Sequence, residues 1–479
     1  MITSMDQDHF ELKYTKNVEC LYGVKRNADA DVLLMNDNIL PHQYNINNRV
    51  DFTDIETFSI DPEGCEDADD AFSIYYKEQK LFLAIHIADP TEFINIDSSI
   101  WSDIEKTIIT KYPSNRKPIH MIPQEIMEKS SLMDNKFGDI KKAITILTEI
   151  DVQTHLPTGK VQMLFSNVKL KKENSLNYLG ASTSIDTNKC LEFGLKISEA
   201  LQLKRSYSTI GTKLNGVTAS IIAYNNKIPY LYQNTPSEMK MKHMIAEFAI
   251  FANSFIGEYL KIHFDGIGIF RTCNAKDFIN DENYKNLSGN ELLHEIITNG
   301  IQAEYINEVA SHDLVGSAEY THFTSPIRRA SDCICHYLLK YIYLKNASIN
   351  ETIKLPFTID KLADLSGKCV IQSKKIKKIQ YTDNKFRLIQ ILHSMLKKSS
   401  TPIKLSYFIT GYKSRFLNLI INKINDFNVY ISYTLMIDDY DYHHNPSTIY
   451  EIDITRVKCL GKFDQGSIPE LDSVFIVKR

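Results

Sequence analysis

Long apolar runs are missing from this 479-residue chain, and no stretch of about 18 apolar residues is present to span a membrane. The first sixteen residues, MITSMDQDHFELKYTK, also lack the apolar core of a signal peptide. The eight cysteines are scattered without a CxxC pair, and Cys333 and Cys335 stand two apart, which is poor spacing for a shared metal on a helix. We therefore expect a cytoplasmic protein with reduced, mostly buried thiols and no membrane segment.

An excess of charge of one sign is also lacking. The chain has 55 Lys and Arg against 59 Asp and Glu, so its net charge of −4 does not single out nucleic acid as a partner. A basic channel can still exist inside such a protein, because binding depends on the local potential. Lysines cluster at KLKK (169–172) and KKIKK (374–378), and for each cluster a solvated helix face is a simpler interpretation than a phosphate track.

Three regions are distinguished along the chain, whose composition is that of an ordinary globular protein. Residues 1–48 show no clear period and predict an N-terminal arm or reduced subdomain. Residues 49–397 predict a compact domain with strands first and helices later. Residues 398–479 contain five short apolar segments with polar turns, which indicate a small β-barrel such as an OB-fold.

The compact domain opens with a predicted hairpin, in which AFSIYY and LFLAIHIADP flank the polar turn KEQK. Such a hairpin would bring Asp89, at the end of its second strand, back beside the acidic segment that precedes the first. Apolar stripes then predict helices at 236–260, with Ser237 as the N-cap, at 325–344 and at about 359–397.

The segment IDPEGCEDADDAFSI (60–74) concentrates acidic residues directly before the first strand of the hairpin. Its aspartates are Asp61, Asp67, Asp69 and Asp70, and they cannot all ionise beside a packed strand unless positive charge compensates them. Divalent cations are the usual solution, and a pair of Mg²⁺ ions can activate water for phosphoryl transfer. A calcium loop counted from Asp61 fails, because its twelfth position is a phenylalanine instead of a glutamate. A solvated acidic turn is the remaining alternative.

A second segment, YTHFTSPIRRASDCICHYLL (320–339), predicts a helix with Ser325 as the N-cap. Arg328, Asp332 and His336 would then share one face. Arginines at a helix start oppose the helix dipole unless an anion such as a phosphate binds there as well. Local salt bridges of the arginine pair are the alternative. Together, the two segments favour phosphoryl transfer on a polyanion.

These segments resemble the two signatures of the RNB family, which includes ribonuclease II, ribonuclease R and the catalytic exosome subunit. The family pattern of Ile-Asp-Pro followed by Asp-x-Asp-Asp-Ala stands here as IDPEGCEDADDA, and YTHFTSPIRR matches the second signature residue for residue. Weaker matches are LAIHIADPT (83–91), TKYPSNRKPIHMIPQEIMEKSSL (110–132) and HMIAEFAIFAN (243–253). The resemblance covers about 49–397 and implies an α+β fold, with an RNB-type catalytic domain of mixed sheet and surrounding helices followed by the OB-fold-type barrel.

The resemblance implies an Mg²⁺-dependent hydrolytic exoribonuclease that degrades single-stranded RNA from its 3′ end to 5′-mononucleotides. Two Mg²⁺ ions are expected, with Mn²⁺ as a substitute. By position in the family pattern, the resemblance implies Asp61, Asp67, Asp69 and Asp70 as metal ligands. It implies Asp69, Arg328 and Arg329 as catalytic residues, with the arginines stabilising the scissile phosphate.

The resemblance also implies residues that contact RNA. They are Tyr112 and Tyr178, which would stack on bases near the 3′ end, together with Glu247, Ser325 and His336. An ordinary packing tyrosine is the alternative for Tyr178. A carboxylate paired within the core is the alternative for Glu247.

Departures from the family pattern leave other functions open. Two adjacent glutamates of the family are Ala246-Glu247 here, so discrimination of RNA from DNA would be relaxed if the lost glutamate reads the ribose. The family's Arg-Arg-Tyr has Ala330 in third place. Residues 1–48 are too few for two cold-shock barrels, so we expect a protein partner to supply RNA guidance. A catalytically silent RNA-binding or scaffold protein is the alternative from another class, although the retention of four aspartates argues against it.

Overall fold

The computed structural model of the chain describes residues 22–23, 25–114, 116–225, 228–346, 352–399, 401–413, 416–436, 448–461 and 471–477. The predicted N-terminal arm therefore falls partly outside the described residues, and its described part contains helix α2 (Ala28–Asn36). Among the helices within these ranges, none is both long and apolar enough to cross a membrane.

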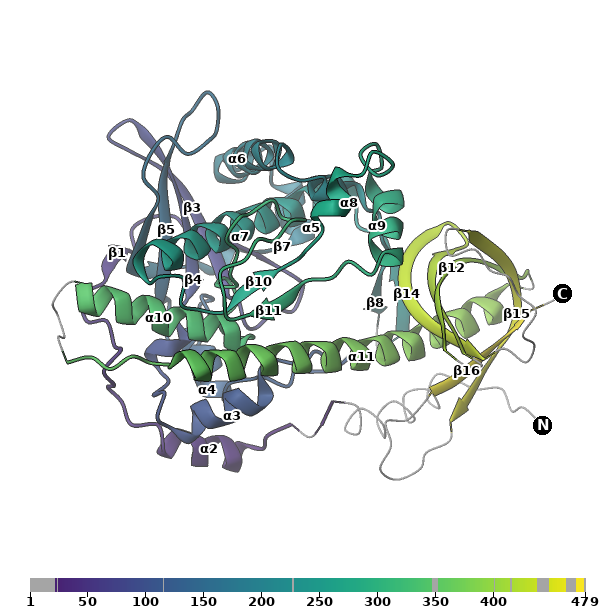
Figure 1. Ribbon diagram of the computed structural model, residues 1–479, viewed down its shortest axis with the longest axis horizontal. Helices are drawn as coiled ribbons and strands as arrows, with labels where there is room; N and C mark the ends of the chain where they lie inside the picture. Colours follow the sequence, from purple (N-terminus) through teal and green to yellow (C-terminus); the bar gives the residue numbers. More distant parts are fainter. Residues whose placement is uncertain are drawn as a thin grey trace.

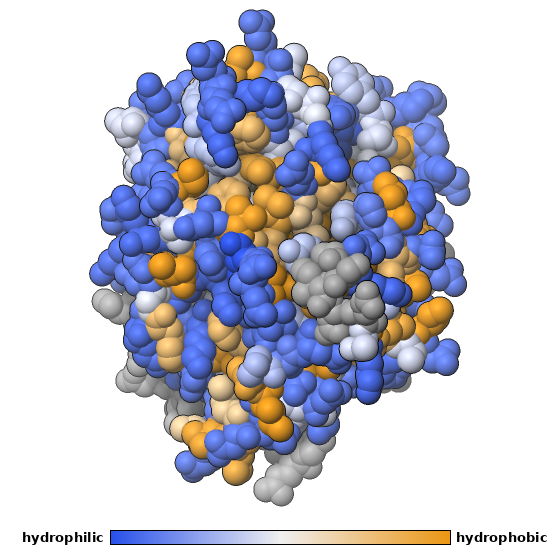
Figure 2. Space-filling model, turned by 90° about the vertical axis from the view of Figure 1, so that its left-hand side faces the viewer, coloured by the Kyte–Doolittle hydropathy of each residue, from blue (hydrophilic) through white to orange (hydrophobic). Residues whose placement is uncertain are grey.

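A five-stranded sheet forms the centre of the main body (Figure 1). Its strands run in the order β1-β6-β5-β4-β3, where β1 and β6 are parallel and every other pair is antiparallel. They are β1 (Val50–Phe52), β3 (Asp70–Lys77), β4 (Lys80–Ala88), β5 (Ile140–Ile150) and β6 (Gln162–Lys169). Strand β4 is buried along almost its whole length, which explains why its sequence is a continuous apolar run instead of an alternating one. Viewed from the side of β1, hydrophilic residues cover much of the surface, and a group of apolar residues is visible in its upper middle (Figure 2).

The predicted hairpin is confirmed as β3 and β4. Glu78 and Gln79 form its turn with φ values of 51° and 65°, and positive φ at both central positions is typical of a type I′ turn. The returning strand does reach the acidic segment, because the N–H of Ala88 donates to the carbonyl oxygen of Asp69 at 2.8 Å.

Asp89, the next residue, directs its carboxylate into a buried ion cluster. Lys340 Nζ lies 3.1 Å from a carboxylate oxygen of Asp89 and 2.9 Å from one of Glu92. Arg49 bonds the same two carboxylates at 2.6 and 2.7 Å. Burial alone would raise the pKa of Glu92, but Lys340 and Arg49 lower it to about 2. Two cations and two anions therefore compensate one another inside the core.

The long helices of the described chain include α7 (Pro236–His263), α10 (Ala330–Asn346) and α11 (Ile359–Lys398). The N-cap of α7 is Thr235 instead of the predicted Ser237. The Thr235 hydroxyl accepts from the N–H of Glu238, whose carboxylate accepts from the N–H of Thr235, and Pro236 follows as the first helical residue. Helix α10 runs through the middle of the body and is buried from its first residue for more than three turns.

Shorter elements complete the main body. Its other helices are α3 (Ser99–Thr107), α4 (Gln124–Ser130), α5 (Tyr178–Thr183), α6 (Lys189–Ser206), α8 (Lys276–Asn280) and α9 (Gly289–Thr298). Three two-stranded sheets pair β2 (Ser59–Asp61) with β7 (Ser175–Asn177), β8 (Ile221–Asn225) with β9 (Ile228–Tyr232), and β10 (Phe270–Thr272) with β11 (Glu304–Ile306).

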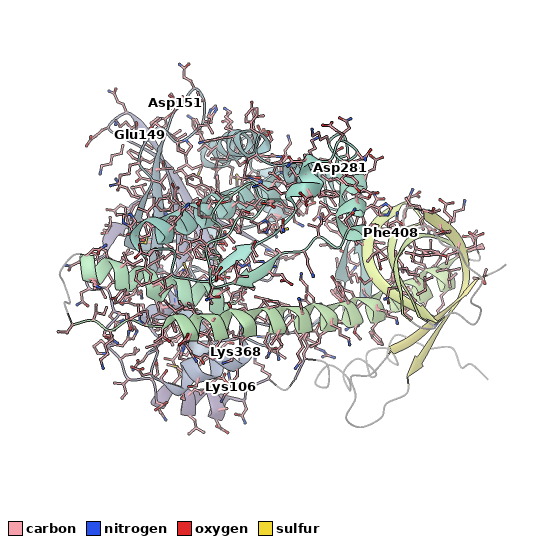
Figure 3. All side chains as sticks on the ribbon, in the orientation of Figure 1. Lys106, Glu149, Asp151, Asp281, Lys368 and Phe408 are labelled. Carbon is pink, nitrogen blue, oxygen red and sulfur yellow. The ribbon has the colours of Figure 1, made fainter. Side chains whose placement is uncertain are left out.

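The C-terminal strands form the curled antiparallel sheet expected of a small barrel (Figure 1). They are β12 (Ile403–Lys413), β13 (Phe416–Ile424), β14 (Phe427–Met436), β15 (Ile449–Gly461) and β16 (Leu471–Val477), in the order β14-β13-β12-β15-β16. The end of α11 shares their core, where Leu388 and Leu392 pack with Leu405. Phe408 on β12 meets His294 on α9, with ring centroids 3.9 Å apart (Figure 3). The α+β fold with a terminal barrel is thus confirmed.

Candidate active site

One cavity of about 590 Å³ brings the two signature segments together. The acidic segment contributes Asp61, Cys65, Asp67, Asp69 and Asp70 to its lining, and the second segment contributes Tyr320, His322, Thr324, Ser325, Arg328 and Arg329. One face of α7 forms another wall, with Lys242, Ile245, Ala246, Ala249, Ile250 and Asn253 at helical spacing. Tyr112 and Tyr178 also line the cavity. All four predicted metal ligands therefore face the same space as both predicted arginines.

The acidic segment is a loop between two strands. Asp61 ends β2 and Asp70 begins β3, and mutual backbone hydrogen bonds of 2.8 Å between Phe58 and Phe72 hold the two strand ends together. Gly64 makes the turn possible, because its φ of +78° is strained for any residue with a Cβ. Closing this loop places the aspartates at its two ends in one site.

Asp69 links the acidic loop to the second signature. Its Oδ1 accepts the backbone N–H of Ile327 at 2.8 Å, and its Oδ2 accepts Nε–H of Arg328 at 3.0 Å. Arg328 also donates through Nη2 to the hydroxyl of Ser325 at 2.9 Å. The guanidinium is thus held at the cavity by Asp69 and Ser325.

The predicted helix start at Ser325 is wrong, because α10 begins at Ala330. The N–H of Ala330 donates to the carbonyl oxygen of Ile108 at 2.9 Å, and the carbonyl oxygen of Arg328 accepts the N–H of Thr110 at 3.0 Å. At this point the chain therefore pairs with a distant segment instead of continuing a helix. Asp332 and Asp69 accept the N–H groups of Ser325 and Ile327, both at 2.8 Å. The arginines therefore lie in a turn before the helix instead of on its first turn. Ser325, predicted to contact RNA, does line the cavity.

Arg329 behaves differently from Arg328. Its Nε and Nη2 both donate to the carboxylate of Asp332, at 3.0 and 2.7 Å. The local salt bridge, which was the alternative interpretation of the arginine pair, is therefore what the structure shows for Arg329. A fork-shaped pair of this kind orients the guanidinium, which still borders the cavity.

Burial raises the pKa values of the aspartates. Burial, followed by the proximity of Asp70, raises the pKa of Asp61 to about 7. Burial raises the pKa of Asp69 to about 8, although Arg328 opposes the shift, and it raises the pKa of Asp70 to about 6, although Arg328 and Arg329 oppose it. Full ionisation at neutral pH therefore requires more positive charge than the arginines supply.

The residues present fit a hard divalent cation in donor type. Carboxylate oxygens are the preferred ligands of Mg²⁺, and Asp61 Oδ2 is a buried oxygen without a hydrogen-bond partner. Across the described ranges, no three His, Cys, Asp or Glu side chains are arranged to hold a metal ion as they stand. Asp69 is bonded to Arg328 and Asp67 to Tyr112, so coordination requires these carboxylates to exchange partners.

The two predicted stacking tyrosines flank the acidic loop. Tyr112 is 38% exposed and its hydroxyl donates to Asp67 Oδ2 at 2.9 Å. Its segment is tied to α11, because the N–H of Ser114 donates to the carboxylate of Asp383 at 2.9 Å. Tyr178 begins α5, and the ammonium of Lys242 lies 5.2 Å from its ring centroid.

Two residues predicted to contact RNA, Glu247 and His336, do not line the cavity. Glu247 is absent from the cavity lining, since its carboxylate faces the other side of α7 and accepts Nε–H of Arg205 at 3.1 Å. It is the core-paired carboxylate of the alternative interpretation. His336 is fully buried, and its Nε2 lies 3.0 Å from the carbonyl oxygen of Phe323. His336 therefore lies beneath the signature loop and contacts its backbone.

The sequence analysis missed polar residues that complete the cavity. Asn253 Oδ1 accepts the N–H of Phe323 at 2.8 Å, and its Nδ2 donates to the Tyr320 hydroxyl at 3.1 Å. His322 Nδ1 lies 2.8 Å from the hydroxyl of Tyr305. Two signals were available: an asparagine within the apolar stripe of FAIFAN, and a histidine inside the second signature itself.

Comparison with known proteins identifies a family for this chain. A family model described as the RNB domain matches residues 49–345. Ribonuclease R of Helicobacter pylori is 25% identical over 334 residues, which cover 63% of this chain and 50% of that protein. The chain spans about half the length, or less, of the curated relatives that it matches.

Two solved structures share the fold. Ribonuclease R of Mycoplasma genitalium, in complex with ribose-methylated single-stranded RNA, superposes with a TM-score of 0.69 at 15% identity, over 96% of this chain and 78% of that one. Yeast Ssd1, described as a pseudonuclease, superposes with a TM-score of 0.63 at 15% identity, over 89% of this chain and 55% of that one. Because the family model covers more than half of the sequence and both signatures meet at one cavity, the chain belongs to the RNB domain family.

Proposed function

We propose that this chain is an Mg²⁺-dependent hydrolytic exoribonuclease, which degrades single-stranded RNA from its 3′ end and releases 5′-mononucleotides. The observation that carries the proposal is the contact between Asp69 and Arg328, which joins the acidic loop to the arginine loop at one cavity. The naming of curated relatives as ribonucleases supports it. Six cysteines are free and all of them but Cys65 are buried, which is compatible with a reducing cytoplasm: Cys65, Cys190, Cys273, Cys333, Cys335 and Cys369.

The roles of the residues follow from their chemistry. Asp61, Asp67, Asp69 and Asp70 would hold Mg²⁺, which when bound supplies an activated water and stabilises the leaving oxygen. Arg328 would donate to the scissile phosphate and offset the charge that develops there, since its guanidinium has donors beyond those bonded to Asp69 and Ser325.

The aromatic residues would position the strand. Tyr112 and Tyr178 would present ring faces to the terminal bases, a form of contact that is indifferent to base identity. The apolar part of the α7 wall would exclude water from the sugar side of the cavity.

The test is incubation of a 5′-labelled RNA carrying a single-stranded 3′ tail, with Mg²⁺, with Mn²⁺ or with EDTA. Stepwise shortening from the 3′ end with either metal, absent in EDTA and in Asp69→Asn, is expected. The exposed Asp186 provides the matched control, since Asp186→Asn removes one carboxylate outside the cavity. Shortening that persists in Asp69→Asn would refute the proposal, and binding of RNA without turnover would instead identify a silent RNB protein.

A second candidate is an exonuclease with relaxed choice between RNA and DNA. Ala246 lines the cavity, whereas the neighbouring Glu247 is engaged by Arg205, so the described α7 wall offers no carboxylate to a ribose 2′-hydroxyl. Ala246→Glu should raise the ratio of RNA to DNA degradation on matched strands, with Ala249→Glu as a control one turn further along the same wall. An unchanged ratio in Ala246→Glu excludes this candidate.

A further inference from the structure

One exposed face of α11 concentrates basic and aromatic side chains. Lys374, Lys375, Lys377, Lys378 and Tyr381 lie within about two turns of this helix and are all exposed, Tyr381 by 47%. We call these five residues the α11 lysine face. It contains the KKIKK cluster, for which a solvated helix face was the simpler interpretation.

Among the residues that the structure describes, most lysines of the α11 lysine face have no acidic partner. Lys374 pairs with Glu304 at 2.7 Å, but Lys375, Lys377 and Lys378 form no ion pair within the part of the chain that the structure describes. A solvated face on the same helix looks different, because Lys368 pairs with Asp364 one turn away at 2.8 Å. The uncompensated lysines therefore depart from the pattern of an ordinary solvated face.

Further cations flank this face. Burial and then the charges of Arg271 and Lys374 lower the pKa of Lys377. Burial and then the charge of Lys375 lower the pKa of Lys111. Both pKa shifts reflect positive charges that lie close together: Lys377 near Arg271, and Lys375 near Lys111. A concentration of positive charge of this kind favours a polyanionic ligand.

The first connection to the cavity runs through the Tyr112 segment. Beneath the lysines, Ile376 and Ile379 are buried against Ile109 and Ile119, which flank that segment. Lys111 is the residue directly before Tyr112, which lines the cavity. Helix α11 therefore adjoins one edge of the cavity through its apolar face, and Lys375 borders this edge beside Lys111.

The second connection runs through β11, against which α11 packs. The guanidinium carbon of Arg271 lies 4.5 Å from the ring centroid of Tyr305, and the Tyr305 hydroxyl lies 2.8 Å from Nδ1 of His322. His322 lines the cavity. The side chains of Tyr305 and His322 therefore connect Arg271 to the cavity. Beyond these contacts, α11 continues into the C-terminal barrel (Figure 1).

From this arrangement we propose that the α11 lysine face binds the backbone of single-stranded RNA on its way to the cavity. The lysines would neutralise successive phosphates, and Tyr381, at helical spacing from Lys374, Lys377 and Lys378, would stack on a base. The inference rests on the proposed function for the direction of the strand. The binding itself requires no hydrolysis.

The experiment measures the affinity of a 5′-fluorescein oligouridylate by anisotropy, in EDTA and over a series of KCl concentrations. Strands of about 20 and about 4 nucleotides separate binding along the face from binding in the cavity alone. Lys375→Gln/Lys378→Gln should weaken binding of the long strand about tenfold and reduce the salt slope by about 1.4, at roughly 0.7 for each lost phosphate contact. Binding of the short strand should be unchanged.

Tyr381→Ala provides an independent readout. It should weaken binding of the long strand about tenfold without changing the salt slope, because stacking releases no counterions. Lys77→Gln/Lys160→Gln is the matched control, because both lysines are exposed and lie in or beside the turns that connect strands of the central sheet. Glu149 and Asp151, at the same end of that sheet, lie far from α11 (Figure 3). The control should bind both strands like the parent chain.

The outcomes separate this inference from the proposed function. Equal weakening by the control pair, or an unchanged affinity in Lys375→Gln/Lys378→Gln, overturns the role of the face. A third outcome is that polyglutamate binds the parent chain but not Lys375→Gln/Lys378→Gln, while both bind RNA equally well. This outcome would assign the face to an acidic protein and would also overturn the inference. Length-dependent binding through the face without Mg²⁺-dependent shortening would support the inference while refuting the proposed nuclease.

Discussion

Nε of Arg328 donates to Oδ2 of Asp69 at 3.0 Å, across 259 positions of sequence. The carboxylate is almost fully buried, whereas the Arg328 side chain remains 44% exposed. One end of the guanidinium is thus fixed in the protein and the other is available to the cavity. This arrangement combines a rigid anchor with an accessible donor.

Arg328→Ala should reduce the rate of RNA hydrolysis about 10²–10³-fold, because it removes a donor aimed at developing charge. Arg328→Lys should recover only part of this loss, since an ammonium cannot bond Asp69, Ser325 and a phosphate in fork geometry. Single-turnover degradation with saturating enzyme measures the chemical step. Either variant should change the RNA affinity measured by anisotropy less than about threefold, because the guanidinium mainly stabilises charge that develops in the transition state. A loss confined to affinity would contradict this role.

Substitution of Tyr112 separates its ring from its hydroxyl. Tyr112→Phe removes the hydrogen bond to Asp67 but keeps the ring face, so a 4-nucleotide RNA should bind within about twofold of the parent chain. Tyr112→Ala should weaken the same binding by about 1–3 kcal/mol, the range measured for base stacking. Equal weakening in both variants would show that the hydroxyl, and not stacking, is responsible.

Stabilisation of the protein by Mg²⁺ should depend on pH. Burial raises the pKa values of Asp61 and Asp69 to about 7 and about 8, so their ionisation lowers the stability of the metal-free fold as pH rises from about 4 to 8. Mg²⁺ binds the ionised carboxylates, so its apparent affinity should fall at least tenfold when the pH is lowered from 8 to 6. At saturating Mg²⁺, a tenfold loss of affinity reduces the stabilisation of the fold by about 1.4 kcal/mol. Thermal unfolding at fixed ionic strength, with and without Mg²⁺, measures the difference.

The control for this pH dependence is Asp61→Asn/Asp69→Asn. The double variant removes both titrating groups, so its melting temperature should respond weakly to Mg²⁺ at either pH. A stabilisation of the parent chain that is equal at pH 6 and pH 8 would be inconsistent with metal binding by these carboxylates.

Lys340→Met should destabilise the fold by about 3–5 kcal/mol, because it leaves Arg49 as the one buried cation bonded to both Asp89 and Glu92 among the described residues, while the part-exposed Lys142 pairs with Glu92 alone. Urea unfolding at pH 7 measures the loss. The surface pair of Lys129 and Glu125 is the control, and Lys129→Met should cost less than about 0.5 kcal/mol. Similar losses in both variants would mean that the buried cluster contributes no special stability.

Elements with local signals were predictable from the sequence. The apolar runs on either side of KEQK determine β3 and β4, and the stripes of α7 and α11 locate both helices to within a few residues. The four aspartates were found for a similar reason, since their repulsion is evident within ten positions of sequence. Their meeting with Arg328 followed from the resemblance, because no local pattern connects two segments so far apart.

Errors arose where a distant part of the chain decides the local structure. The helix predicted from Ser325 begins later because the N–H of Ala330 donates to the carbonyl oxygen of Ile108, more than 200 positions earlier, instead of to a carbonyl oxygen one turn before it. The burial of His336 and the pairing of Glu247 with Arg205 depend in the same way on which helix face meets a neighbour. A carboxylate or imidazole in an apolar run is compatible with a pocket or with the core, and only the packing distinguishes them.

Helix α11 ties the C-terminal barrel to the site. Its 40 residues form a continuous rod of about 60 Å, with its last turns inside the barrel core and its middle bonded through Asp383 to Ser114, two residues from Tyr112. The barrel and the loop that carries Tyr112 are therefore attached to the same continuous helix, which fixes the spacing between them.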